Sequence, residues 1–187
     1  MLDAVVGVFM IESRFWKEEI SRIERSIRPV SKPARFSVRR LCVVERDLHL
    51  AFFMVRKMLE MEKLSSSVAQ TLVSVGKALC RGGRVHRLNN GWIEDLYDIE
   101  NGVSDQVPLF VMCNHFVHSR MSRLFRGEDR NWSDVWLVSD WKRNEFIFQV
   151  EFSEISRVLQ LVAEDGGGDA VCIRWSKGDQ DYVRCEP

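Results

Sequence analysis

Apolar side chains recur at helical spacing along the first third of the chain. Over residues 4–27 they keep close to the 3.6-residue period of an amphipathic helix, at Val5, Phe9, Trp16, Ile20, Ile23 and Ile27. Over residues 35–63 they alternate three and four positions apart, as in a coiled-coil seam, at Leu41, Val44, Leu48, Ala51, Val55 and Met58. Pro29 and Pro33 lie between the two segments and cannot continue a helix. Two long helices are therefore predicted.

Two more helices are predicted before residue 126. One runs over residues 68–80, from a serine cluster at 65–67 that can cap it to the glycine pair at 82–83. The other runs from Pro108, which suits the first turn of a helix, to Phe125. The stretch between them carries asparagine–glycine turn signals and should be irregular. Residues 1–126 are thus predicted to form a bundle of about four helices.

After Gly127 the pattern changes to a period of two, which is typical of strands. Strands are predicted over residues 135–139 and 145–152, followed by a helix that Ser153 caps and the glycines at 166–168 end. A second hairpin is predicted from residues 170–175 and 181–185. The expected fold class is α+β, with a β-β-α-β-β unit over residues 127–187 packed on the helical bundle.

Composition limits the classes of function. The chain has 187 residues, 45% of them hydrophobic, and equal numbers of basic and acidic residues, 27 of each. A globular core is expected, and no overall charge favours nucleic acid, although basic residues outnumber acidic ones between Arg14 and Arg46. No apolar run approaches the roughly 18 residues of a membrane span. Five scattered cysteines favour reduced thiols, so a cytoplasmic location is expected, with no cofactor.

One short segment places polar groups within an apolar run. Residues 113–118 read Cys-Asn-His-Phe-Val-His, inside the apolar stretch 107–125. On a helix Asn114 and His118 would share the inward face, with Cys113 and His115 turned elsewhere. A buried amide or imidazole without a partner costs about 1–3 kcal/mol. The pair is therefore either a structural network, joined to Glu45 or His49, or a catalytic site.

The same pair resembles a known motif. An Asn-x-x-x-His step on a late helix, after a long helix that begins with charged residues, is similar to the Arg-Asn-x-x-x-His motif of the helical HEPN nucleases. The resemblance implies a dimeric ribonuclease site, with His118 as the general acid or base and Asn114 orienting it. Cys113 stands where the family has arginine, which implies a non-hydrolytic relative unless Arg40, Arg46 or Arg120 supplies the cation.

Two other kinds of site are alternatives. Glu45 and His49 lie on a polar stripe beside the seam of the second helix, and together with His115 and His118 they have spacings that could ligate a metal ion in a helical bundle. The simpler interpretation of Glu45 and His49 is an ordinary i,i+4 polar pair. Cys113 beside two histidines is a further candidate nucleophile, although thiols in apolar runs are commonly inert packing groups.

Aromatic residues indicate a partner. Trp132, Trp136 and Trp141 crowd around the first predicted hairpin and exceed what a small core needs, which favours self-association or a protein partner. The leading hypothesis is a non-catalytic protein that binds another macromolecule or its own copy, with Arg40, Arg46 and Arg120 as binding residues and RNA as a candidate ligand. The competing hypothesis is a ribonuclease that uses His118. No small-molecule ligand is indicated.

Overall fold

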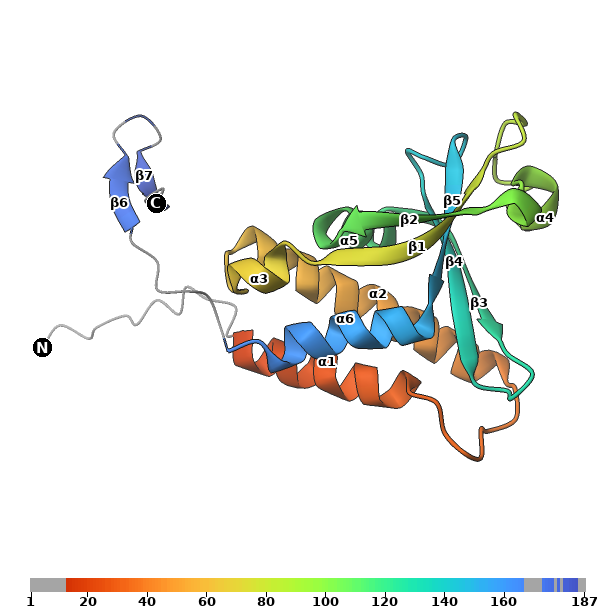
Figure 1. Ribbon diagram of the computed structural model, residues 1–187, viewed down its shortest axis with the longest axis horizontal. Helices are drawn as coiled ribbons and strands as arrows, with labels where there is room; N and C mark the ends of the chain where they lie inside the picture. The colour runs from red at the N-terminus through yellow and green to blue at the C-terminus, as the bar shows by residue number, and fades with distance from the viewer. Residues whose placement is uncertain (1–12, 167–172, 177, 179, 185–187) are drawn as a thin grey trace, which may run out of the picture.

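The protein is a mixed α+β structure in which long helices cover a five-stranded antiparallel sheet (Figure 1). The computed structural model describes residues 13–166, 173–176, 178 and 180–184. In chain order the elements are α1 (Ser13–Ile27), α2 (Val38–Glu60), α3 (Ser66–Ala69), β1 (Leu72–Leu79), α4 (Ile93–Leu96), the 3-10 helix η1 (Ile99–Asn101), β2 (Val103–Pro108), α5 (Leu109–Val117), β3 (Ser119–Arg126), β4 (Trp132–Ser139), β5 (Phe146–Glu151), α6 (Phe152–Glu164), β6 (Ile173–Ser176) and β7 (Asp181–Arg184).

The sheet has the strand order β2-β1-β5-β4-β3, so β2 and β3 are its edges. All four pairings are antiparallel, with Val73 opposite Val107 in β1–β2 and Val135 opposite Val150 in β4–β5. β1 pairs with β5, and the last paired residues are Leu79 and Phe146, which have 66 residues between them in the sequence. β6 and β7 pair with each other as a second, two-stranded sheet.

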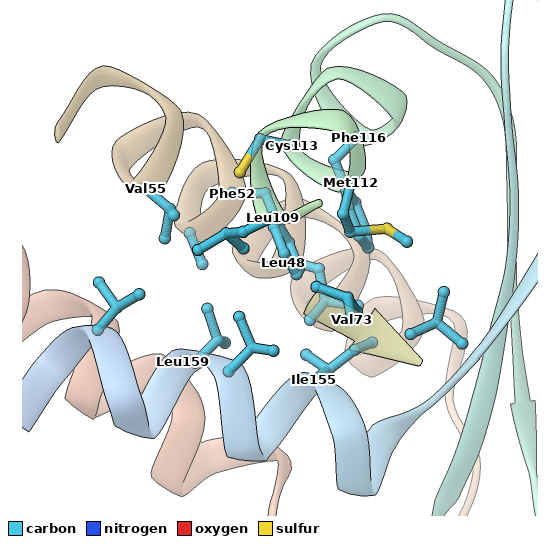
Figure 2. Packing of buried hydrophobic residues seen from close by; sticks show 14 of the residues in the cluster. Leu48, Phe52, Val55, Val73, Leu109, Met112, Cys113, Phe116, Ile155 and Leu159 are labelled. Atoms are coloured by element: carbon cyan, nitrogen blue, oxygen red, sulfur yellow. The ribbon is translucent and has the colours of Figure 1, made fainter. Parts of the chain in front are cut away.

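The main core lies between the helices and one face of the sheet. Alternate strand residues such as Val73 in β1 and Phe148 in β5 point into it, because successive side chains of a strand alternate between the two faces. Figure 2 shows Phe52 of α2, Phe116 of α5 and Leu159 of α6 meeting in this core. The rings of Phe52 and Phe116 stack with their centroids 4.0 Å apart. The helices and the sheet therefore form one packed unit.

A smaller cluster covers part of the opposite face. Ala78, Val138 and Ile147 of the sheet pack there against side chains of the α4 region. Tyr97 is the largest of these side chains, and its hydroxyl donates to the carbonyl of Arg143 at 2.6 Å. Burial raises the pKa of Tyr97 well above its ordinary value. Among the described residues, the neighbouring part of this sheet face lines a cleft.

Buried polar links join the helices to each other. The Nζ of Lys17 in α1 donates to a carboxylate oxygen of Asp165, just after α6, at 3.0 Å, and the backbone N–H of Ser65 donates to the same oxygen. Burial alone would raise the pKa of Asp165, yet these hydrogen bonds outweigh it and hold that pKa below its ordinary value. The ends of α1 and α6 are thereby fixed next to the loop before α3.

Two of the predicted helices are wrong. Residues 68–80 form the end of α3 and then strand β1, and residues 108–125 divide into the end of β2, the short helix α5 and most of β3. The apolar residues of β1 fit a helical period as well as a strand period. The segment forms a strand because β2 and β5 pair with it on both sides, so that the backbone N–H and C=O groups along both of its edges form hydrogen bonds. A four-helix bundle over residues 1–126 is therefore not formed.

Other predictions agree with the structure. The coiled-coil-like helix corresponds to α2, and β4, β5, α6, β6 and β7 follow in the predicted order. β4 and β5 belong to the same sheet as β1, β2 and β3, so this sheet takes strands from both sides of residue 126. Residues 4–12 of the first predicted helix, and residues 170–172 of the second predicted hairpin, lie outside the described residues.

Candidate functional site

The polar segment at residues 113–118 is oriented differently from the prediction. α5 begins at Leu109 and packs through Met112, Cys113 and Phe116, which recur at the spacing of one helical face. Cys113 and His115 are buried, Asn114 is half-buried, and His118 is exposed at the C-cap. The predicted inward pair of Asn114 and His118 is therefore wrong, because the face of the short helix is set by its contact with α2.

His115 and Cys113 are core groups. The imidazole of His115 lies with its ring centroid 4.7 Å from that of Phe148, and within the described residues its Nδ1 has no hydrogen-bond partner. Burial, with a smaller contribution from Lys142, lowers the pKa of His115 to about 4. Burial raises the pKa of Cys113 to about 12. A thiol that stays protonated in this way is a packing group, so the nucleophile interpretation of Cys113 is wrong.

Asn114 and His118 contact each other through the backbone. The N–H of His118 donates to the carbonyl of Asn114 at 3.0 Å and closes the end of α5. The Oδ1 of Asn114 is buried and has no hydrogen-bond partner among the described residues. The ring of His118 lies 6.4 Å from that of Trp141. Among the described residues, no side-chain hydrogen bond joins Asn114 or His118 to Glu45 or His49. Glu45 and His49 have another partner.

That partner is Ser122, in the edge strand β3. The Ser122 hydroxyl donates a hydrogen bond to Oε1 of Glu45, and its Oγ lies 3.4 Å from Nε2 of His49. On the other side of the imidazole, Nδ1 lies 3.0 Å from the carbonyl of Phe116. Glu45 and His49 are four residues apart on α2 and so present both side chains to the strand. The three groups form one hydrogen-bonded cluster, which we call the Ser122 cluster.

The Ser122 cluster lines a cleft of about 640 Å³ between the first half of α2 and β3. Among the described residues, three arginines line the same cleft, Arg46 from α2 and Arg120 and Arg123 from β3, and Glu45 is the one carboxylate. Asn90 and Gly91, in the loop before α4, form another part of the wall. Arginines therefore outnumber carboxylates in the lining, although each of them also pairs with a carboxylate outside it: Arg46 with Asp47, Arg120 with Asp140 and Arg123 with Glu94.

The arginines keep free donors. Arg46 donates twice to Asp47, yet more than half of its side chain is exposed. Nη1 of Arg123 is 3.5 Å from the carbonyl of Gly91, a long contact. Nη1 of Arg120 lies 3.4 Å from Asp140, and its Nε is buried without a hydrogen-bond partner within the described residues. An anion in the cleft would satisfy such donors, because a guanidinium presents five N–H groups.

Local structure explains why these residues meet. Ser37 caps α2 by accepting from the backbone N–H of Arg40, and it thereby starts the helix at the position that brings Glu45 and His49 to β3. A register shift between β3 and β4 leaves Arg120 without a partner in the ladder. Such bulges change the direction of a side chain. Arg120 and Arg123 can therefore both line the cleft, although an odd spacing on a regular strand would separate them.

The three arginines predicted to bind a ligand differ in their positions relative to the cleft. Arg46 and Arg120 lie at the cleft, whereas Arg40 is exposed on the first turn of α2 and is not part of its lining. Arg123 and Ser122 were missed because residues 108–125 were interpreted as one helix. Residues 121–126 read Met-Ser-Arg-Leu-Phe-Arg and do not alternate strictly between apolar and polar, so the sequence pattern held no clear signal for a strand here.

The predicted metal ligands are not brought together. Glu45 and His49 lie in the Ser122 cluster, His115 lies in the core, and His118 lies at the surface. Among the described residues no group of three or more His, Cys, Asp or Glu side chains could hold a metal ion. The alternative of a metal site formed by these four residues is therefore wrong.

A second cleft has the opposite charge. It measures about 900 Å³ and lies over the open face of the sheet, where Ser74, Gly76 and Gln149 are among its lining residues. Three carboxylates line it, from Asp105, Glu151 and Glu154, against one basic residue, Lys77. An anionic ligand would be repelled here and attracted to the cleft between α2 and β3.

The chain matches no protein-family model, and neither a curated protein nor a solved structure is detectably similar to it. The resemblance to the HEPN nucleases therefore stays a prediction. Within the described part of the chain, no helix is both long and apolar enough to cross a membrane. The function has to be argued from the chemistry of the cleft.

Proposed function

We propose that this protein binds RNA through the phosphate groups of a single strand, in the cleft between α2 and β3. The observation that carries the proposal is the convergence of Arg46, Arg120 and Arg123 on one cleft of a chain with no net charge. Phosphate contacts supply most of the affinity of such binding, and arginine forks match phosphate oxygens in pairs.

The partly exposed end of the Arg120 guanidinium supports the same ligand. Its Nη1 lies 3.4 Å from Asp140, a long contact, so the group can also donate to a phosphate oxygen. The side chain of Asn90 adds a neutral hydrogen-bonding group to the same wall. A cleft of about 640 Å³ at the edge of a sheet has room for a few nucleotides of one strand and not for a duplex about 20 Å wide.

Replacing the three arginines with glutamine tests the proposal. At 0.15 M salt each lost phosphate contact should weaken binding of a fluorescent 12-nucleotide RNA about fourfold, and the triple variant about 50-fold, since single strands follow a salt slope near 0.7 per contact. Fluorescence anisotropy at several salt concentrations measures both the affinity and the slope. The slope should fall by about 0.7 for each arginine removed.

Arg40→Gln is the matched control, because Arg40 is exposed on the same helix and lies outside the cleft. Its affinity for the RNA should equal that of the parent protein. A triple variant that binds as tightly as the parent would overturn the proposal. A single-stranded DNA of the same sequence, bound equally well, would assign the cleft to phosphate alone and overturn the choice of RNA.

Self-association is the second candidate, supported by exposed apolar side chains on α2. Val43, Leu50 and Phe53 lie along one stripe of the helix, with Leu50 47% exposed, and Phe53 also contacts Trp16 of α1. A protein without net charge lacks the repulsion that keeps copies apart. Of the three tryptophans predicted as an interface, Trp141 is the largely exposed one.

Leu50→Lys is expected to shift the protein from dimer to monomer, because a charge would be buried in the joined surface. Analytical ultracentrifugation over a range of concentrations measures the change. Leu88→Lys, in a loop where the side chain is 90% exposed, is the control and should leave the dimer intact. A parent protein that remains a monomer at about 100 μM, far above the dissociation constant of a stable dimer, would refute self-association.

A further inference from the structure

We infer that Ser122 is a nucleophile, activated by His49, that cleaves a phosphodiester bond held in the cleft between α2 and β3. The inference rests on the proposed function, because it assigns chemistry to the ligand that the arginines bind. The Ser122 cluster supplies a hydroxyl and a base within reach of it, and the carbonyl of Phe116 orients that base.

The orientation of His49 follows from its partners. The carbonyl of Phe116 can only accept a hydrogen bond, so Nδ1 of His49 must carry the proton that it donates across 3.0 Å. In the neutral ring Nε2 is then an acceptor, and it faces Oγ of Ser122 at 3.4 Å. This distance is longer than a good hydrogen bond, as is common for a catalytic base in a protein without its substrate. His49 can therefore take the hydroxyl proton.

Glu45 competes for the same proton. The Ser122 hydroxyl has one hydrogen, and both the Glu45 carboxylate and the His49 imidazole can accept it. The hydroxyl hydrogen can point to only one of these two acceptors at a time. We assign Glu45 as a positioning residue, which holds the hydroxyl toward the cleft and stabilises the positive charge that His49 gains during the reaction.

The reaction balances without a cofactor. Oγ of Ser122 forms a bond to phosphorus while its proton passes to Nε2 of His49, and the bond from phosphorus to the leaving oxygen breaks as that oxygen takes the proton from His49. Water then attacks the phosphoserine, gives a proton to His49, and the Oγ–phosphorus bond breaks as Ser122 regains the proton. Arg120 and Arg123, which line the same cleft, would supply the donors to the non-bridging oxygens.

A reactive phosphonate tests the nucleophile directly. A fluorophosphonate probe should add once to the parent protein, and peptide mass spectrometry should place the adduct on Ser122. Ser122→Ala should give no adduct, and His49→Gln should label at least about 100-fold more slowly, the usual contribution of a general base. Ser119→Ala is the matched control, since Ser119 lines the same cleft on the same strand, and it should label like the parent.

Absence of an adduct in the parent, or an adduct that persists in Ser122→Ala, would overturn the inference. Melting temperatures of all variants show whether a lost adduct reflects unfolding. A second assay measures cleavage of bis(p-nitrophenyl) phosphate through the release of nitrophenolate, in the presence of a metal chelator. This activity should be lost in Ser122→Ala and retained in His118→Ala. Cleavage lost in His118→Ala but retained in Ser122→Ala would assign the chemistry to His118 and refute the role of Ser122.

RNA binding separates this inference from the proposed function. Ser122→Ala keeps all three arginines and should bind the 12-nucleotide RNA as the parent does. RNA binding without an adduct would refute the nucleophile and leave the binding function standing. If the probe labels Ser122 but the protein does not bind RNA, the proposed RNA-binding function is wrong. The assignment of a phosphodiester as the substrate of Ser122 would then be wrong as well.

Discussion

Phe52→Ala is expected to lower the free energy of unfolding by about 3–5 kcal/mol, the usual loss for a buried phenylalanine. Phe52 is completely buried, and its ring stacks on that of Phe116 at a centroid separation of 4.0 Å (Figure 2). Alanine would leave a cavity where α2 meets α5, and a stacked pair of rings adds to the cost. Denaturant unfolding followed by far-UV circular dichroism measures the loss.

Phe53→Ala is the matched control, because the next residue of the same helix is 43% exposed. Its cost should be about 1 kcal/mol or less, as for substitutions outside the core. If Phe52→Ala does not fold, Phe52→Leu should still fold, with a loss of about 1–1.5 kcal/mol. Equal losses for Phe52→Ala and Phe53→Ala would contradict the packing of α2 on α5.

His115 is expected to make the protein less stable as the pH falls below neutrality. In the folded state its pKa is lowered to about 4, and in an unfolded chain it would be about 6.5. Since the unfolded state binds a proton first, stability from this residue is complete above pH 6.5 and is lost as the pH falls toward 4. Between pH 6.5 and 5 the loss should be about 2 kcal/mol, at 1.36 kcal/mol for each pH unit.

His115→Phe should remove this pH dependence, because a phenylalanine ring fills similar space beside Phe146 and Phe148 without titrating. Urea unfolding at pH 7, 6 and 5 compares the variant with the parent. His118→Gln is the control, since His118 is exposed at the end of the same helix, and it should keep the slope of the parent. A parent protein with constant stability from pH 7 to 5 would contradict a buried, neutral His115.

The polar segment of α5 shows where sequence reasoning failed. Its phase was inferred from a helix over residues 108–125, but α5 is only nine residues long and ends before His118. A short helix takes its buried face from the elements it packs on, here α2 and the sheet, so Cys113 and His115 turn inward. Intrinsic pattern is a weak guide for such short segments, because tertiary contacts override it.

The interpretation of Glu45 and His49 as a polar pair missed their partner for a different reason. They were identified as a polar pair beside the helical seam, and the structure shows that pair on the expected helix, α2. Their partner Ser122 lies 77 residues from Glu45 and 73 from His49, on a strand that the sequence pattern had assigned to a helix. Neither spacing nor composition links positions so far apart.

The sequence by itself determined the helices whose stability is local. α2 and α6 form where the apolar period predicts them, because their backbone hydrogen bonds join residues four apart and their buried faces follow from that period. It also determined the absence of net charge. Only the tertiary structure decided the rest. Strands pair through hydrogen bonds between distant residues, so the sheet and the cleft that gathers Ser122, His49 and the arginines exist only once β3 lies beside α2.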